Sequence, residues 1–376
     1  MAAKPAFAKA ALVPRMPPPI AFADQLDNLA GPLFGSSLFP YLAFLYFICQ
    51  DVNKLSPVAK AGFVSLLAFV FATIVTSIIA VKVYGTTLAN VDWLHAGAEQ
   101  LLTLTNIVEV LGLKLTLDAF ISNAPVDPDA PLTAPKLAGT TAAGTVAITA
   151  LVASITTGGL VDHSPFLGGI GNLPEGVWGL GFVEPANALS LPTWVIHVSS
   201  LLEWLVAMGL VWRIGLVTGN EKWKGLTWAM IPSHSSGICA CVYHLFYNAE
   251  SLTFVVLLQA ALTLLGNCTL AFAAGRLAYS NGWRPPLISE GTAPADPPTA
   301  APVLVDGSAG DTSALLTIAA LSVGLSYFIK YGETLAPIFM EAPAWAPALL
   351  IGGFTCLNAW KWQQRSQAGD DFSGLI

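Results

Sequence analysis

Apolar runs of membrane-spanning length recur along this chain, separated by short polar or proline-rich stretches. A helix needs about 20 mostly apolar residues to cross a bilayer. Such runs predict helices near residues 33–50, 58–84, 91–115, 192–215, 225–247, 250–279, 312–331 and 343–361. A charge-free run at 138–161, rich in Thr, Ala and Gly, predicts a weaker ninth span. The pattern therefore predicts an all-α fold, a polytopic membrane bundle of about nine transmembrane helices.

Composition supports a membrane protein. The chain is 55% hydrophobic and 10% charged, with a mean hydropathy of +0.66, whereas soluble domains carry about 25% charged residues. The net charge of −7 and the lack of a basic patch argue against nucleic acid as a partner. Membrane lipid is the expected environment, and the five cysteines lie mostly inside apolar runs, as packing thiols do.

The spans and the linkers between them divide the chain into segments. Residues 1–30 are basic at first and acid-free before Asp24, which fits either a targeting segment or a disordered stub. Proline-rich, acidic stretches predict a linker at 123–190, which holds the weak span, and a disordered linker at 285–311. The remaining segments are a first three-helix unit at 31–122, a second at 191–284, a C-terminal helix pair at 312–362 and a tail at 363–376.

The two three-helix units look like an internal repeat. Residues 77–106 align with 237–267 and end on Asn106 and Asn267, and 37–45 fall on 197–205. Chance similarity between apolar helices is the alternative. Lys and Arg favour one side of a membrane, and with 138–161 spanning, eleven lie on one side and two on the other, leaving out the N-terminal segment. This count favours nine spans and gives both units the same orientation.

One predicted helix carries a stripe of polar and ionisable residues. Asp92, His95, Glu99, Asn106 and Glu109 recur at intervals of three, four, seven and three, so they share one face. Charged groups inside a bilayer face protein or a water-filled cavity. The stripe therefore indicates a proton or ion path or a ligand site. The alternative is that Asp92 and Glu109 lie at the two interfaces and the others make helix–helix hydrogen bonds.

Two later helices repeat this feature with His197 and Glu203, and with His234, His244 and Asn248. Helix directions place three of the histidines at a similar depth, near the ends with few basic residues. We therefore predict a polar pocket in that leaflet, lined by His95, Glu99, His197, Glu203 and His244. Asp92, Asn106, Glu109, His234 and Asn248 are secondary candidates. Histidine here suits a structural hydrogen bond, proton exchange, or ligation of haem or chlorophyll.

No motif of a known chemistry is present. The sequence lacks a phosphate-binding loop, a dinucleotide fingerprint, zinc-ligand spacing and a Ser/His/Asp set. We therefore predict no catalytic residues and no metal site, and expect a protein that is not an enzyme.

Two stretches resemble uncharacterised families. Residues 194–248, from "WVIHVSSLLEWL" to "VYHLFYN", resemble the family called hypothetical chloroplast open reading frame forty-nine. Residues 36–112, from "SSLFPYLAFLYF" to "LTLTNIVEVLG", resemble a second uncharacterised membrane domain of oxygenic phototrophs. The resemblance implies a chloroplast membrane protein, in the thylakoid rather than the inner envelope, and would make the predicted pocket lumenal. It implies no reaction.

Three functions stay open from sequence. The first is a non-enzymatic factor in biogenesis or pigment loading of photosynthetic complexes, which would be its partners. The second is a transporter of small solutes, ions or protons that uses intramembrane carboxylates. The third is a haem- or chlorophyll-binding membrane protein.

Overall fold

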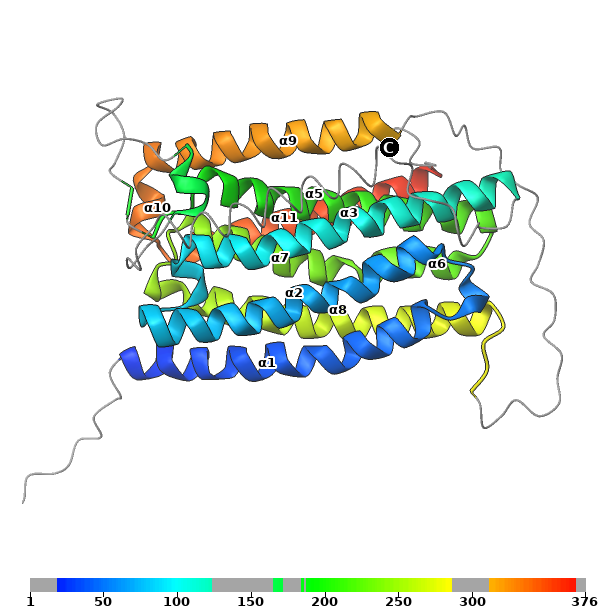
Figure 1. Cartoon of the computed structure of the whole chain (residues 1–376), viewed down its shortest axis with the longest axis horizontal. Helices are drawn as coiled ribbons and strands as arrows, with labels where there is room; N and C mark the ends of the chain where they lie inside the picture. The colour runs from blue at the N-terminus through cyan, green and yellow to red at the C-terminus, as the bar shows by residue number, and fades with distance from the viewer. Residues whose placement is uncertain (1–18, 124–164, 172–183, 186, 286–310, 370–376) are drawn as a thin grey trace, which may run out of the picture.

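The structure, a computed structural model, describes residues 19–123, 165–171, 184–185, 187–285 and 311–369. Every regular element in these residues is helical, so the predicted all-α fold is confirmed. The long helices lie side by side along one axis of the molecule (Figure 1). The predicted weak span at 138–161, the linker at 285–311 and most of the segment at 123–190 lie outside the described residues.

The first unit contains α1 (Pro19–Ile48), α2 (Pro57–Ile79) and α3 (Asp92–Ser122). Helix α1 begins inside the segment 1–30, for which the sequence predicted a targeting segment or a disordered stub, so the helical unit starts earlier than predicted. Proline at its first position costs little, because the first N–H groups of a helix have no intrahelical partner. Ser56 is the N-cap of helix α2, and Pro57 is its first residue. At its other end the helix continues into a π-helical turn, Ala80–Tyr84. The short 3₁₀ turns Asp51–Asn53 and Leu88–Asn90 lie in the connections.

The second unit contains α5 (Leu191–Thr218), α6 (Glu221–Ala229), α7 (Ile231–Leu245) and α8 (Thr253–Ser280). The sequence predicted one helix at 225–247, and this prediction is wrong: α6 and α7 are separate helices that meet at Met230. Pro232 in the first turn of α7 has no N–H to continue the hydrogen bonding of α6. The 3₁₀ turns Phe166–Gly169 and Glu250–Leu252 precede α5 and α8.

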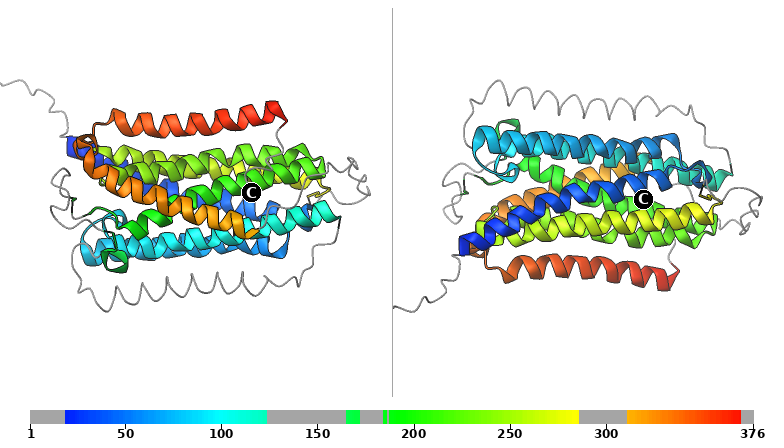
Figure 2. Two further views of the ribbon diagram at one scale, coloured as in Figure 1. Left: turned by 90° about the horizontal axis from the view of Figure 1, so that it is seen from above. Right: turned by 90° about the horizontal axis from the view of Figure 1, so that it is seen from below.

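The C-terminal part contains α9 (Asp311–Gly332), the 3₁₀ turn Glu333–Leu335, α10 (Pro337–Glu341) and α11 (Trp345–Ala368). Helix α11 extends into the residues assigned to a tail at 363–376, so the tail begins later than predicted. Helices α9 and α11 lie on different sides of the bundle (Figure 2). The two helices of the predicted C-terminal pair therefore each cover another part of the bundle.

Five helices of the described residues are long and apolar enough to cross a membrane. They are Leu29–Ile48, Pro57–Tyr84, Leu191–Thr218, Glu250–Ser280 and Leu315–Leu335. Three other predicted spans do not reach this criterion, each for a visible reason. Helix α3 carries the polar stripe, α7 has only 15 residues, and the C-terminal half of α11 is polar.

The two units are interleaved. Helix α1 packs along α8, and α3 packs along α5, so the first helix of each unit lies against the last helix of the other. Helices α2 and α7 pack against α3 and α8 respectively, which again are corresponding pairs. The corresponding helices also run in the same direction, as the colours in Figure 1 show. The arrangement agrees with the parallel repeat that the sequence predicted, but neither unit forms a separate body.

Candidate functional site

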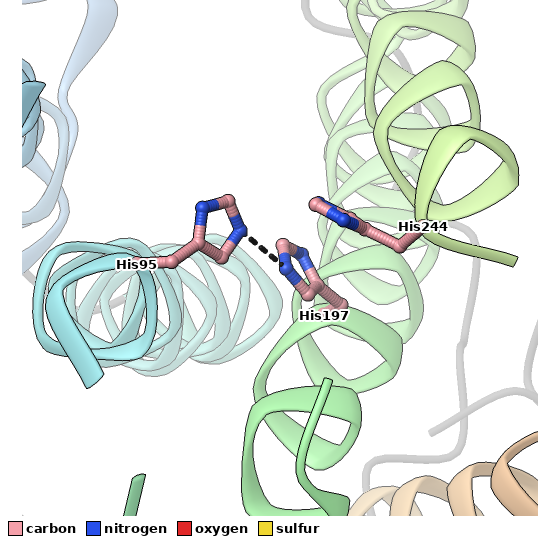
Figure 3. A group of neighbouring side chains, drawn as sticks. All are labelled: His95, His197 and His244. Atoms are coloured by element: carbon pink, nitrogen blue, oxygen red, sulfur yellow. Dashed lines mark hydrogen bonds between the residues drawn. The ribbon is translucent and has the colours of Figure 1, made fainter. Parts of the chain in front are cut away.

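Three histidines from three helices meet at one end of the bundle. His95 of α3, His197 of α5 and His244 of α7 point toward one another (Figure 3). The Nε2 atoms of His95 and His197 are 2.8 Å apart, and the ring centroids of all three pairs lie 4.8–4.9 Å apart. Each histidine is at most 7% exposed. We call these three residues the histidine cluster.

Helix direction places the cluster. His95 lies in the first turn of α3, His197 in the second turn of α5, and His244 in the last turn of α7. Helices α3 and α5 begin at the same end of the bundle, and α7 ends there (Figure 1). The three side chains therefore reach one depth, although His95 is 102 residues from His197 in sequence.

Asp92 holds the starts of α3 and α5 together. Its buried carboxylate accepts hydrogen bonds from the backbone N–H groups of Phe166 and Ser190 and from the hydroxyl of Thr193, at 2.6, 3.2 and 2.7 Å. Thr193 lies about one turn before His197, and Asp92 lies one turn before His95. This carboxylate therefore fixes the distance between the two helices at the cluster.

Asn248 fixes the orientation of the third ring. The Nδ2 group of Asn248 donates to the backbone carbonyl of Ala89 and to Oδ1 of Asn90, at 2.9 and 3.0 Å. Its Oδ1 lies 2.8 Å from Nδ1 of His244. Since a carbonyl oxygen can only accept, Nδ1 of His244 must carry the proton. The lone pair of a neutral His244 is then on Nε2.

The turn after α7 has an unusual backbone that serves this contact. Tyr247 and Asn248 have φ values of 52° and 56°, a left-handed conformation that residues other than glycine seldom adopt. The N–H of Asn248 donates to the carbonyl of Tyr243, and the Tyr243 hydroxyl donates back to the carbonyl of Asn248. The turn thus places the Asn248 amide against His244 at the cost of local strain.

The predicted pocket residue Glu203 lies in a second polar group. Its buried carboxylate accepts hydrogen bonds from Ser199 and Asn106, and its Oε2 atom has no partner. Glu109 of α3 is also buried, and it is close enough to Glu203 for the two carboxyl groups to interact electrostatically. Because Glu203 follows His197 by six residues, it lies about 9 Å further along α5. The structure therefore divides the predicted pocket into a histidine cluster and a deeper carboxylate pair.

Two other candidates lie outside the histidine cluster. Glu99, one turn beyond His95, faces Cys241 of α7. His234 lies near the start of α7, where its Nδ1 is 3.1 Å from the Asn358 amide of α11. It is ten residues before His244, about 15 Å along the helix. His234 is therefore a suitable control position, because it is a buried histidine that does not belong to the histidine cluster.

A buried lysine next to the site was not singled out from sequence. Lys330 of α9 is fully buried; its ammonium donates to the carbonyl of Leu189 and pairs with Glu184, both at 2.6 Å. The carboxylate of Glu333 interacts with Lys330 as well. Burial raises the pKa of Tyr247, and the Glu333 and Glu184 carboxylates raise it further, so this phenol stays protonated. The sequence signal that could have identified Lys330 is its position as a charged residue inside an apolar run.

The cluster has the composition of a ligand- or metal-binding site. Among the described residues, His95, His197 and His244 are the group whose ligand atoms could hold a metal ion, all within 4.8 Å of one another. No carboxylate belongs to this group. Ligand spacing within one helix could not reveal this metal-binding group, because its members come from three helices; helix directions predicted only that they share one depth.

The fold and the site define a helical membrane protein with a buried histidine cluster. Residues 188–276 match the family described as protein of unknown function DUF2499, and residues 30–118 match another, DUF3593. A Ycf49-like protein of Synechocystis sp. is 50% identical over 88 residues, which are 23% of this chain and 85% of that protein. The uncharacterized protein ycf49 of Cyanophora paradoxa is 37% identical over 87 residues, again 23% of this chain and 85% of that protein. The chain thus belongs, through its second unit, to the Ycf49-like family.

The two family matches divide the cluster between them. His197 and His244 lie in the residues matched by the first family, and His95 lies in those matched by the second. No solved structure matches this chain. The complete cluster therefore requires both units in one assembly.

Proposed function

We propose that this protein is a non-enzymatic factor of the chloroplast membrane, in the thylakoid, that binds a ligand at the histidine cluster and supports biogenesis of photosynthetic complexes. The membrane setting rests on five helices of spanning length and composition. The plastid setting rests on the Ycf49-like relatives.

One observation carries the binding role: three buried histidines from three helices direct their rings at one point. Burial of polar side chains in an apolar bundle costs free energy unless each polar atom has a partner. In this cluster Nδ1 of His95 has no partner among the described residues. A packing role alone would be served better by apolar side chains, so the cluster points to a ligand.

Complementation of a deletion strain tests this proposal. A phototrophic host without its own copy receives the wild-type chain, His197→Gln, or the matched control His234→Gln. Native gels of solubilised membranes then measure the amount of assembled photosynthetic complexes. We expect the wild type and His234→Gln to restore the complexes, and His197→Gln to fail although the protein itself accumulates. Normal complexes in the deletion strain, or full restoration by His197→Gln, would overturn the proposal.

The deeper carboxylate pair favours a second candidate function, transport of a proton or cation. Glu203 of α5 and Glu109 of α3 are both buried and close enough to interact electrostatically, and Oε2 of Glu203 has no partner among the described residues. Buried carboxylates of this kind mark ion pathways in membrane proteins. In the same strains, failure of Glu203→Gln together with full restoration by His197→Gln would favour transport over the cluster-based function.

A further inference from the structure

We propose that the ligand of the histidine cluster is a first-row transition-metal ion held by the imidazole nitrogens of His95, His197 and His244. This inference rests on the proposed function, because it names the ligand of the same site. It reverses the expectation of no metal site, which considered only the spacing of ligands along the sequence.

The distances suit a metal after a small adjustment. Two imidazole nitrogens bound to one zinc-sized ion at about 2.0–2.1 Å lie about 3.3–3.6 Å apart. The His95 and His197 Nε2 atoms are 2.8 Å apart, and the ligand atoms of all three residues lie within 4.8 Å. Both values bracket the required separation. Ring rotations that change these separations by about 0.5 Å for the closer pair, and by up to about 1.2 Å for the widest, would bring all three nitrogens to a common ion.

The protonation states also suit a metal. Asn248 leaves the lone pair of His244 on Nε2, in the way that metal-binding histidines donate their other N–H to a fixed acceptor. Nδ1 of His95 has no hydrogen-bond partner among the described residues, so this atom does not restrict the ring to one tautomer. Without a metal, the two facing Nε2 atoms of His95 and His197 need a proton between them. A cation replaces this proton and accepts both lone pairs.

The ligand set selects the class of ion. Three imidazoles suit zinc, copper, iron or nickel, whereas magnesium and calcium prefer oxygen ligands. A haem with two histidine ligands does not fit between these rings. Two histidines that bind one macrocycle lie on its opposite faces, yet the His244 centroid is 4.8 and 4.9 Å from those of His95 and His197. The third ring would occupy the place of the macrocycle.

Metal analysis of the purified full chain tests the inference. The wild type, His197→Gln, Asn248→Ala and the control His234→Gln are purified in mild detergent, stripped with a chelator and reloaded with zinc, copper(I) or cobalt(II). Elemental analysis measures the bound metal, and the visible absorption of cobalt reports nitrogen coordination. We expect about one ion per chain in the wild type and His234→Gln, and none in His197→Gln. For Asn248→Ala we expect a Kd that is 10–100-fold higher, because His244 loses the acceptor that fixes its ring and its Nδ1 proton.

Several results would overturn the metal site. These are the absence of stoichiometric metal in the reloaded wild type, equal binding by His197→Gln, or equal loss in His234→Gln. Circular dichroism of each variant identifies loss of fold, and Asn248→Ala provides a test that keeps all three ligands. The complementation assay separates this inference from the proposed function. Bound metal without any effect on photosynthetic complexes would refute the function alone, and an effect of His197→Gln without bound metal would refute the metal alone.

Discussion

At the scale of single residues, the site depends on polar groups that position histidines rather than on the histidines alone. Asp92 and Asn248 were secondary candidates from the sequence, because each continued a polar stripe of a predicted helix. In the structure Asp92 makes three hydrogen bonds with other segments, and Asn248 makes two with the segment before α3 and one with His244. Asp92 joins the starts of the two helices that carry His95 and His197, and Asn248 holds the ring of His244.

Replacement of Asp92 by alanine is expected to destabilise the protein strongly. The change leaves the buried N–H groups of Phe166 and Ser190 without their acceptor, and each such group costs about 1–3 kcal/mol. We expect the free energy of unfolding to fall by about 3 kcal/mol or more, measured by circular dichroism during denaturant titration in detergent. Asp118→Ala on the same helix is the control, since its pair with Lys114 is partly exposed and is worth about 1 kcal/mol or less. Equal effects of both changes would contradict this role of Asp92.

At the scale of elements, close contact between α2 and α3 sets the position of the helix that carries His95. A Cβ atom on Gly112 would lie 2.1 Å from the backbone N of Ala59, and one on Gly62 would lie 2.7 Å from the Cα of Glu109. Small residues that let two backbones approach in this way are typical of membrane helix pairs. The Ser56 hydroxyl adds a hydrogen bond of 2.7 Å to the Gly112 carbonyl.

Gly112→Ala is therefore expected to force α2 and α3 apart. Overpacking of this kind costs about 1–3 kcal/mol or more, so we expect a lower melting temperature in detergent. Gly209→Ala in α5 is the matched control, because nothing lies within 4 Å of the added Cβ. Alanine has a higher helix propensity than glycine by about 0.5–1 kcal/mol, so this control should keep or raise the melting temperature. A fall in both variants, or in neither, would show that the α2–α3 contact adapts to a larger residue.

At the scale of the whole molecule, charge and helix direction define two different ends. The basic residues of the described helices and their connections lie mainly toward one end: Lys54, Lys60, Lys114, Arg213, Lys222, Lys224, Arg276, Arg284, Lys361 and Arg365. The opposite end carries Lys82, Lys330 and the histidine cluster. By the positive-inside preference, we expect the cluster near the membrane side opposite the basic end; in the proposed chloroplast setting the basic end faces the stroma.

Cysteine labelling tests this orientation. In a background without the five native cysteines, Asp51→Cys places a thiol at the basic end, and Thr87→Cys places one at the other end; both positions are exposed. Sealed vesicles of known orientation are treated with a maleimide that cannot cross the membrane. We expect the thiol at position 51 to react only from the stromal side, and the thiol at 87 only from the other. Reversed labelling of the two positions would contradict this orientation, and reaction of both from one side would show that α2 does not cross the membrane.

The interleaved packing also shows that the site is not repeated. The aligned segments place Ser37 of α1 where α5 has His197. Both residues lie at a contact between the first helix of one unit and the last helix of the other, and the Asn267 amide of α8 donates to the backbone carbonyl of Ser37 at 2.9 Å. The two equivalent interfaces have therefore diverged, and one of them carries the histidines.

The sequence by itself determined the helical membrane class, the approximate positions of the long helices and the polar faces of α3, α5 and α7. These follow from composition and from periodicity within one helix, which are local properties. It also placed His95, His197 and His244 at one depth, because depth depends only on helix direction and on distance from a helix end.

Only the tertiary structure decided which side chains touch. Rotation of α3, α5 and α7 about their axes depends on packing, for example on the Asp92 hydrogen bonds and on the close α2–α3 contact, and neither has a local sequence signal. For this reason His95, His197 and His244 form one cluster while Glu203 joins Asn106. The same long-range packing interleaved the two units and brought buried Lys330 beside the start of α5.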